Sequence, residues 1–242
     1  MKESIYTIPI TEAYEQTDAC PLCVLRNQFE TDALEYLSGG AMMDSDVRLE
    51  TNRLGFCAAH LSALAAGPNR LATALILESH LIAVLESLQD GIPEKRSRFS
   101  GGRNGDDYTT RLSKFAGSCY VCHRLEKRDA QVVSNTVHRW KTDRDFRAVF
   151  ESRNDYCLPH TAAMLKSAHD TLGGQYPGFA KTLTALFGAK LEGLLGDIQG
   201  FTASFDYRRA GQAPTAAERA AIAATAPILT GFSQTAGEKQ HP

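Results

Sequence analysis

Hydrophobic residues recur along most of the chain at intervals of three and four, which is the period of an amphipathic helix. The segment from Leu71 to Leu88 predicts one helix of this kind, which stops at Gly91. No segment has a convincing alternation of hydrophobic and polar residues, the signature of a half-buried strand. The pattern therefore predicts an all-α protein. The longest hydrophobic stripe contains Leu183, Phe187, Leu191, Leu194, Ile198 and Phe201.

Turn-forming residues divide this helical pattern into segments. Residues 94–107, rich in glycine, serine and charged residues towards their end, are the clearest linker in the chain. Thr215 and Glu218 have the spacing of a capping box, which predicts a short helix near the C-terminus. The expected organisation is a first helical module at 1–93, a linker at 94–117, a second module at 118–210, and a short helix with a disordered tail at 211–242.

All six cysteines belong to one pattern that occurs twice. In each copy a C-x-x-C pair is followed more than thirty residues later by a C-x-x-H pair. The first cysteines of the two C-x-x-C pairs are 99 positions apart, and the cysteines of the two C-x-x-H pairs are 100 apart. We interpret this as an internal repeat. The eight residues are Cys20, Cys23, Cys57, His60, Cys119, Cys122, Cys157 and His160.

Three thiolates and one imidazole are the ligands of closed, tetrahedral structural zinc sites. A cysteine and a histidine three positions apart on a helix share one face, so both can bind the same ion. The sequence therefore predicts two structural zinc ions per chain. One would lie in each module and tie the start of the C-x-x-C helix to the start of the C-x-x-H helix.

Other chemistry is possible for these cysteines. A C-x-x-C pair at a helix N-terminus can cycle through a disulfide, but thioredoxin-like sites need a βαβ scaffold that this pattern lacks. A redox- or zinc-responsive thiol switch, chaperone-like in action, stays open as an alternative, and so do buried free cysteines. Cys119 to His123 also matches the C-x-x-C-H of c-type haem attachment, but the first copy has Val24 at the histidine position.

Composition and motifs narrow the function further. The formal net charge of −2, and the acidic residues interleaved with the basic ones of the second module, do not favour nucleic-acid binding. No phosphate-binding loop, nucleophile elbow or paired-carboxylate motif is present, and four ligands leave no open position for catalytic water. The sequence therefore does not predict an enzyme, although one with an unrecognised site, or a nucleic-acid-binding regulator, is a further alternative.

The expected location is the cytoplasm, without a membrane anchor. The N-terminus lacks the hydrophobic run of a signal peptide. The most hydrophobic segment is interrupted by Glu78, His80 and Glu86, so we expect it not to cross a bilayer. In a reducing compartment the cysteines stay available for metal. The most economical function is a non-enzymatic interaction or regulatory scaffold with an unknown protein partner.

Five stretches of the sequence stand out: Ile5–Pro9, Cys20–Cys23, Met42–Cys57, Pro68–Leu71 and Phe205–Arg208. They resemble an uncharacterised bacterial family, a domain of unknown function found largely in anaerobic and Gram-positive bacteria. Some of its members carry the automatic label "ABC transporter substrate-binding protein", which suits poorly a chain without a signal sequence. The resemblance implies no activity. The second copy departs from the first, with Tyr120 for proline and Tyr156 for phenylalanine.

Overall fold

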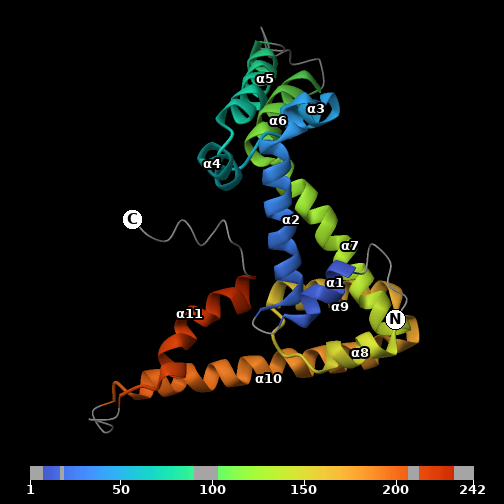
Figure 1. Ribbon diagram of the computed structural model, residues 1–242, viewed down its shortest axis with the longest axis vertical. Coiled ribbons are helices and arrows are strands. Elements are labelled where there is room, and N and C mark those ends of the chain that lie inside the picture. The colour runs from blue at the N-terminus through green and yellow to red at the C-terminus, as the bar shows by residue number, and fades with distance from the viewer. Residues whose placement is uncertain (1–7, 17–18, 90–102, 207–212, 232–242) are drawn as a thin grey trace. The chain divides into compact units, whose positions relative to one another are not determined.

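The computed structural model describes residues 8–16, 19–89, 103–206 and 213–231 (Figure 1). This part of the chain contains α-helices and two short 3-10 helices but no strand, so the predicted all-α class is confirmed. The helices are α1 (Ile8–Glu15), α2 (Pro21–Ser38), η1 (Gly40–Met43), α3 (Ser45–Leu54), α4 (Ala58–Ala66), α5 (Arg70–Gln89), α6 (Arg103–Gly117), α7 (Tyr120–Thr142), α8 (Arg144–Glu151), α9 (Leu158–Thr171), η2 (Gly173–Gln175), α10 (Tyr176–Ala203) and α11 (Ala216–Thr230).

The chain divides into two compact units that do not follow the predicted consecutive modules. The first unit combines the described residues of Met1–Asn27 with those of Arg128–Gln234, and the second contains those of Gln28–Lys127. Both boundaries fall inside long helices, α2 and α7, rather than in the predicted linker. The end of that linker is helical, because α6 occupies 103–117, and residues 94–102 lie outside the described part.

An aromatic core holds the first unit together. Phe150, Tyr156 and Phe179 are fully buried, and their rings lie 5.0 Å (Phe150–Tyr156) and 5.6 Å (Phe150–Phe179) apart. Trp140 of α7 meets Phe179 of α10 edge to face at 5.0 Å, and Tyr14 of α1 meets this cluster from the other end of the chain. Such rings bury large hydrophobic areas and gain from the offset and edge contacts. The core therefore joins α1, α7, α8 and α10 with the loop before α9.

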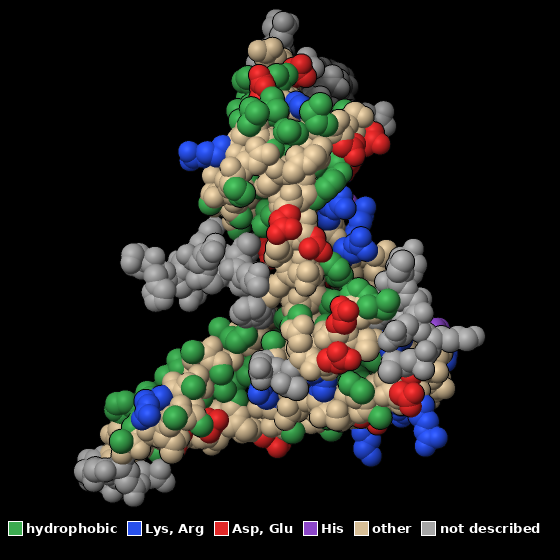
Figure 2. Space-filling view, viewed as in Figure 1, with side chains coloured by type: hydrophobic (Ala, Val, Ile, Leu, Met, Phe, Trp, Pro, Cys, Tyr) green, Lys and Arg blue, Asp and Glu red, His purple; other side chains and the backbone are tan. Residues whose placement is uncertain are grey.

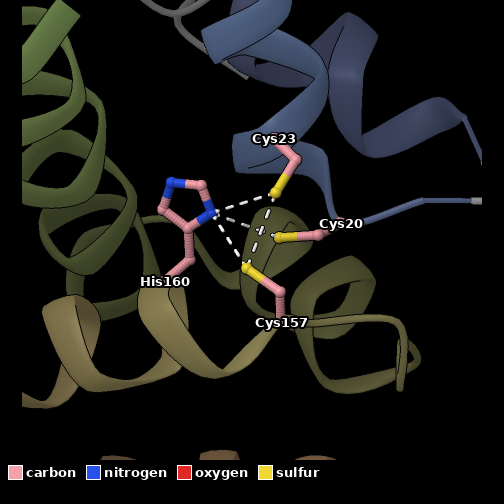
Figure 3. Close-up of side chains that lie close together, drawn as sticks. All are labelled: Cys20, Cys23, Cys157 and His160. Carbon is pink, nitrogen blue, oxygen red and sulfur yellow. Dashed lines mark hydrogen bonds between the residues drawn. The ribbon is translucent and has the colours of Figure 1, made fainter. Parts of the chain in front are cut away.

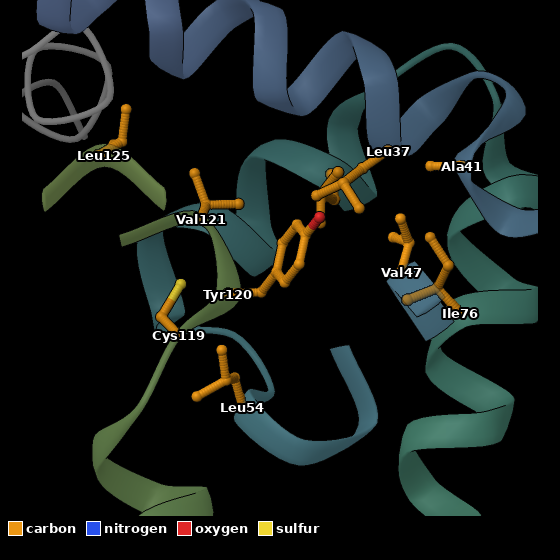
Figure 4. Close-up of a cluster of buried hydrophobic side chains, with 10 residues drawn as sticks. Leu37, Ala41, Val47, Leu54, Ile76, Cys119, Tyr120, Val121 and Leu125 are labelled. Atoms are coloured by element: carbon orange, nitrogen blue, oxygen red, sulfur yellow. The ribbon is translucent and has the colours of Figure 1, made fainter. Parts of the chain in front are cut away.

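The core of the second unit is mostly aliphatic (Figure 4). It joins the end of α2 and the helices that follow it to the first turns of α7. One ligand cysteine, Cys119, is itself part of this core and only 6% exposed. The buried residues of the cluster are Leu37, Ala41, Val47, Leu54, Leu64, Ile76, Cys119, Tyr120, Val121 and Leu125.

Helix α5 carries hydrophobic side chains that the described part of the chain leaves exposed. Leu81, Ile82, Leu85 and Leu88 are 39–59% exposed, and Figure 2 shows hydrophobic side chains on the surface over α5. By length and composition alone, α5 is long and apolar enough to cross a membrane. Its most apolar stretch of 18 residues has a mean hydropathy of 1.6, and 17% of that stretch is buried. The expectation that the charged and polar residues of this segment exclude it as a span is therefore not supported.

The C-terminal helix begins where its capping box predicts. The Thr215 side chain accepts a hydrogen bond from the Glu218 backbone N–H, and the Glu218 carboxylate accepts one from the Thr215 N–H. The helix extends to Thr230 and ends at Gly231, whose φ of 81° and ψ of 155° belong to a region that essentially only glycine occupies. The rest of the predicted disordered tail, residues 232–242, lies outside the described residues.

Candidate metal centres

The first cluster of metal-binding side chains lies in the first unit (Figure 3). It brings the C-x-x-C pair at the start of α2 to the C-x-x-H pair at the start of α9. Nδ1 of His160 lies 3.6 Å from Sγ of Cys20, 3.4 Å from Sγ of Cys23 and 3.2 Å from Sγ of Cys157. The sulfurs of Cys23 and Cys157 are 3.5 Å apart. All four residues are buried.

The second cluster has the same composition and lies in the second unit. Nδ1 of His60 is 3.1 Å from Sγ of Cys57, 3.3 Å from Sγ of Cys119 and 3.4 Å from Sγ of Cys122. The sulfurs of Cys57 and Cys122 are 3.9 Å apart. Cys57 and Cys122 are partly exposed, whereas the other two residues are buried.

The N–S and S–S distances in both clusters fit tetrahedral coordination of a metal ion better than they fit hydrogen bonding. With Zn–S near 2.3 Å and Zn–N near 2.05 Å, tetrahedral angles place nitrogen about 3.6 Å from each sulfur and sulfurs about 3.8 Å apart. The observed N–S distances in the two clusters are 3.1–3.6 Å. A single imidazole Nδ1 carries one hydrogen at most, so it cannot donate to three sulfurs at once. The sulfurs are also free thiols, too far apart for disulfides.

All eight predicted residues take part, but the predicted pairing within each module is wrong. The first C-x-x-C meets the second C-x-x-H, and the second C-x-x-C meets the first C-x-x-H. Helix length supplies the reason. The 18 residues of α2 span about 27 Å, whereas the 10 residues of α3 that precede Cys57 span about 15 Å, so α3 alone does not bring the chain back to the start of α2. The same holds for the 23 residues of α7 and the 8 of α8 before Cys157.

A buried arginine assembles the first cluster. Arg153 precedes Cys157 in the loop between α8 and α9, and it is 8% exposed. Its guanidinium donates to the backbone carbonyl of Tyr14 at 2.5 Å and to that of Ala19 at 3.2 Å, and it pairs with Asp155. Because Ala19 directly precedes Cys20, these bonds hold the Cys157 loop against the chain that delivers the C-x-x-C pair.

A glycine and two backbone carbonyls assemble the second cluster. Gly55 ends α3 with φ 60° and ψ −153°, a conformation essentially restricted to glycine, and a Cβ there would lie 2.8 Å from Nε2 of His80. Its carbonyl accepts from the backbone N–H of Tyr120 at 2.9 Å, and the hydroxyl of Ser118 donates to the carbonyl of Leu54 at 2.7 Å. These bonds hold the turn before Cys57 against the start of α7.

Each of the four ligand pairs places a cysteine at the N-terminus of a helix. Cys57 and Cys157 are the N-cap residues of α4 and α9, while Cys20 and Cys119 directly precede α2 and α7. The unpaired backbone N–H groups and the dipole at a helix N-terminus favour negative charge there. These positions therefore suit ligands that are anionic once a metal is bound.

Glu30 supports the second cluster from α2. Its carboxylate oxygen Oε1 lies 2.8 Å from Nε2 of His60, and both side chains are at most 7% exposed. When Nδ1 of a histidine binds metal, Nε2 carries the hydrogen and donates to such a carboxylate, which orients the ring and strengthens the ligand. Glu30 was not among the sequence-predicted residues, because nothing in its spacing connects it with His60.

The protonation of the second cluster reflects crowded negative charge. Burial lowers the pKa of His60, but bonds to Cys119 and Glu30 and the nearby thiolates outweigh it and raise this pKa to about 10. Burial raises the pKa of Cys119, yet the bond to His60 and backbone N–H groups lower it to about 6. Burial and the Cys119 thiolate raise the pKa of Cys122 to about 12. Cys119 is therefore deprotonated most easily, while His60 and Cys122 hold protons that a bound cation would displace.

The pKa values of the first cluster are shifted by the same effects. Burial lowers the pKa of His160, and the bonds to Cys20 and Cys23 overcome this effect and raise it to about 10. The pKa of Cys20 lies well below its ordinary value despite burial, because Cys157, Cys23 and His160 donate to its sulfur. The pKa of Cys157 is raised by its hydrogen bonds to the sulfurs of Cys20 and Cys23 and by burial. The thiols thus share protons that a divalent metal would displace.

One family model matches residues 1–235, almost the whole chain, and its description is a family of unknown function, DUF6062. The chain belongs to DUF6062. No curated protein matches the chain, and no solved structure does. Membership of DUF6062 brings no activity with it, so the function must be argued from the two Cys3His clusters, which are able to hold metal ions.

The two clusters of this DUF6062 member differ in what lies beside them. The end of α11 covers the first cluster, since a Cβ on Gly231 would lie 3.7 Å from Sγ of Cys23 and 4.0 Å from Sγ of Cys157. A pocket of about 390 Å³ adjoins the second cluster, and Cys57 and Cys122 are among the residues that line it. His123 lines this pocket but belongs to neither cluster.

Proposed function

We propose that this protein is a non-enzymatic helical scaffold held together by two structural zinc ions, one in each Cys3His cluster. The observation that carries the proposal is the geometry of each cluster, in which three sulfurs surround a single histidine Nδ1 at 3.1–3.6 Å. Three thiolates and one imidazole favour zinc over magnesium or calcium, which take oxygen ligands. Four protein ligands leave no position for a reactive water, which supports a structural role.

Zinc in this arrangement would do more than stabilise a loop. Cys23 and Cys157 are 134 residues apart, and Cys57 and Cys122 are 65 apart, so each ion would join distant segments. Zinc binding to structural sites contributes apparent free energies of about 10–16 kcal/mol, which rival the 5–15 kcal/mol stability of a typical domain. We place the protein in the reducing cytoplasm, where its six thiols would stay available for metal.

The experiment that tests the zinc centres is metal analysis of protein purified without added metal. The proposal requires close to two zinc ions per chain. Cys23→Ser should lose one of them, and His160→Ala should lose the same one. His123→Ala is the matched control and should keep both, since His123 belongs to neither cluster. A zinc content near zero with six titratable thiols would overturn the proposal.

The exposed face of α5 supports the role of an interaction scaffold. Contiguous hydrophobic side chains at a surface mark sites of protein or membrane interaction, and a protein partner is our proposal here. Leu85→Lys on α5, where the side chain is 55% exposed, should abolish association with a partner that co-purifies with the intact chain. Leu195→Lys on α10 starts from a similar exposure, 56%, and should leave that association intact. Equal association for both variants would exclude α5 as the interaction surface.

A further inference from the structure

The thiolates of the second cluster are accessible in a way that those of the first are not. Cys57 and Cys122 are partly exposed and line the pocket of about 390 Å³. A water molecule needs roughly 10–15 Å³ of such space, so a molecule as small as a peroxide fits easily beside the sulfurs. Cys20, Cys23 and Cys157 are at most 6% exposed, and Gly231 lies over two of their sulfurs.

The distance between the sulfurs does not distinguish the two clusters, but their exposure does. The sulfurs of Cys57 and Cys122 are 3.9 Å apart, while those of Cys23 and Cys157 are closer still, at 3.5 Å. Both pairs are near enough for a small backbone or rotamer movement to close a disulfide of about 2.05 Å. Oxidation of cysteine depends on thiolate character and on exposure to the oxidant. Only the second pair is exposed, at the pocket, to a small oxidant.

We propose that this pocket is an oxidation site, at which a small neutral peroxide converts Cys57 and Cys122 into a disulfide and releases the metal of the second cluster. This inference rests on the proposed zinc centres and makes one of them redox-responsive. The other centre stays closed and keeps its unit folded. Charge favours a neutral oxidant, because three thiolates outweigh one Zn²⁺ and Glu126 adds a carboxylate to the pocket wall.

The reaction balances with peroxide as the only oxidant. One thiolate of the pair, written here as Cys57, attacks a peroxide oxygen, so that an S–O bond forms, the O–O bond breaks and hydroxide leaves. The thiolate of Cys122 then attacks the sulfenic sulfur of Cys57, forming the S–S bond and expelling a second hydroxide. The two thiolates lose two electrons in total and the peroxide gains them. With only Cys119 and His60 left as ligands, the cluster would no longer hold a zinc ion.

The test uses the full chain with its measured zinc content, treated with hydrogen peroxide while released zinc, intact mass and disulfide-linked peptides are followed. One zinc should be released, and the mass of the metal-free chain should be about 2 Da lower than that of its dithiol form. Peptides linked by a Cys57–Cys122 disulfide should appear at the same time. The second zinc should leave at least tenfold more slowly. Equal release of both ions, or a first disulfide among Cys20, Cys23 and Cys157, would overturn the inference.

Two tryptophan variants test access without removing a ligand. Ala116 lines the pocket and is exposed, so Ala116→Trp should narrow the entrance and slow the first release severalfold. Ala148→Trp, at an exposed position of α8 in the other unit, should leave the rate unchanged. An unchanged rate in Ala116→Trp would show that the pocket is not the route. Protein that starts without zinc would instead overturn the proposed zinc centres themselves, which metal analysis before peroxide distinguishes.

Discussion

At the scale of single residues, the two clusters differ in the side chains that support their ligands. Arg153 holds a loop of the first cluster through backbone carbonyls, whereas Glu30 holds a ligand of the second directly, through Nε2 of His60. A carboxylate in this position fixes the ring and makes the metal-bound nitrogen more basic. Support of this kind acts on metal affinity, and support by loop anchoring acts on folding.

Replacing Glu30 should therefore weaken one zinc centre and spare the other. Glu30→Gln keeps the size of the side chain but removes its charge, and loss of such a partner typically costs 10–100-fold in metal affinity. Titration with a chelator should move the step for the second cluster by about that factor and leave the other step in place. The Cys23→Ser background, which retains only the second cluster, assigns the step. A shift in both steps, or in neither, would contradict this role of Glu30.

Zinc binding at the second cluster should also depend steeply on pH. With pKa values of about 10 for His60 and about 12 for Cys122, both groups hold a proton at pH 7 to 8 in the metal-free cluster. Zinc must displace both protons, so affinity rises with pH and falls on acidification. At least two displaced protons correspond to a change of about 100-fold or more between pH 7 and pH 8. Chelator competition in the Cys23→Ser variant measures the slope, and a slope below two would contradict the assignment.

At the scale of elements, α11 acts as a cover for the first cluster. The helix packs on α9 and α10, and its C-terminal Gly231 lies over the sulfurs of Cys23 and Cys157. The backbone there adopts a conformation that costs other residues on the order of 1–3 kcal/mol. The cover therefore depends on a glycine at its last residue, where the helix ends.

Gly231→Ala should loosen this cover and expose the first zinc. Strain at φ 81° should shift the end of α11 away from the sulfurs, and zinc release from the first cluster to a chelator should become severalfold faster. Gly193→Ala within α10 is the matched control. Nothing lies near its new Cβ, and the change should stabilise the protein by about 0.5–1 kcal/mol without altering zinc release. Identical release rates for wild type and Gly231→Ala would show that α11 does not shield the site.

Much of the structure at this scale could be predicted from the sequence, because it depends on residues that are close together in the chain. The all-α class, the helix after Thr215 and the eight clustered residues all follow from local spacing. Contacts with Glu30 and Arg153 could not be predicted, since their partners lie 30 and more than 130 residues away. The turn at Gly55 is intermediate. Its glycine is visible in the sequence, but the clash with His80 that requires glycine is not.

At the scale of the whole molecule, the prediction that each module contains a complete ligand set is wrong, and the ambiguity lies in the sequence itself. Two C-x-x-C pairs and two C-x-x-H pairs form complete ligand sets in either combination, so ligand chemistry cannot choose between them. The choice depends on how far α2 and α7 carry the chain before the C-x-x-H pairs, a property of helix length rather than motif. Each compact unit consequently draws its ligands from both predicted modules.

This exchange predicts that neither half of the chain can build a zinc centre alone. A division after residue 97 falls outside the described helices and yields two fragments with four ligand residues each. In the fragment 1–97, Cys20 and Cys23 belong to one cluster and Cys57 and His60 to the other, and the fragment 98–242 holds the complementary halves. Each fragment alone should be poorly folded and hold no tightly bound zinc as a monomer. Mixed in equal amounts with zinc, the fragments should form a complex with two ions per pair and recover helical circular dichroism. Cys23→Ser in the first fragment should reduce this to one ion, which ties the recovery to the exchanged pairing. A single fragment that binds one zinc as a monomer and unfolds cooperatively would instead support pairing within each module.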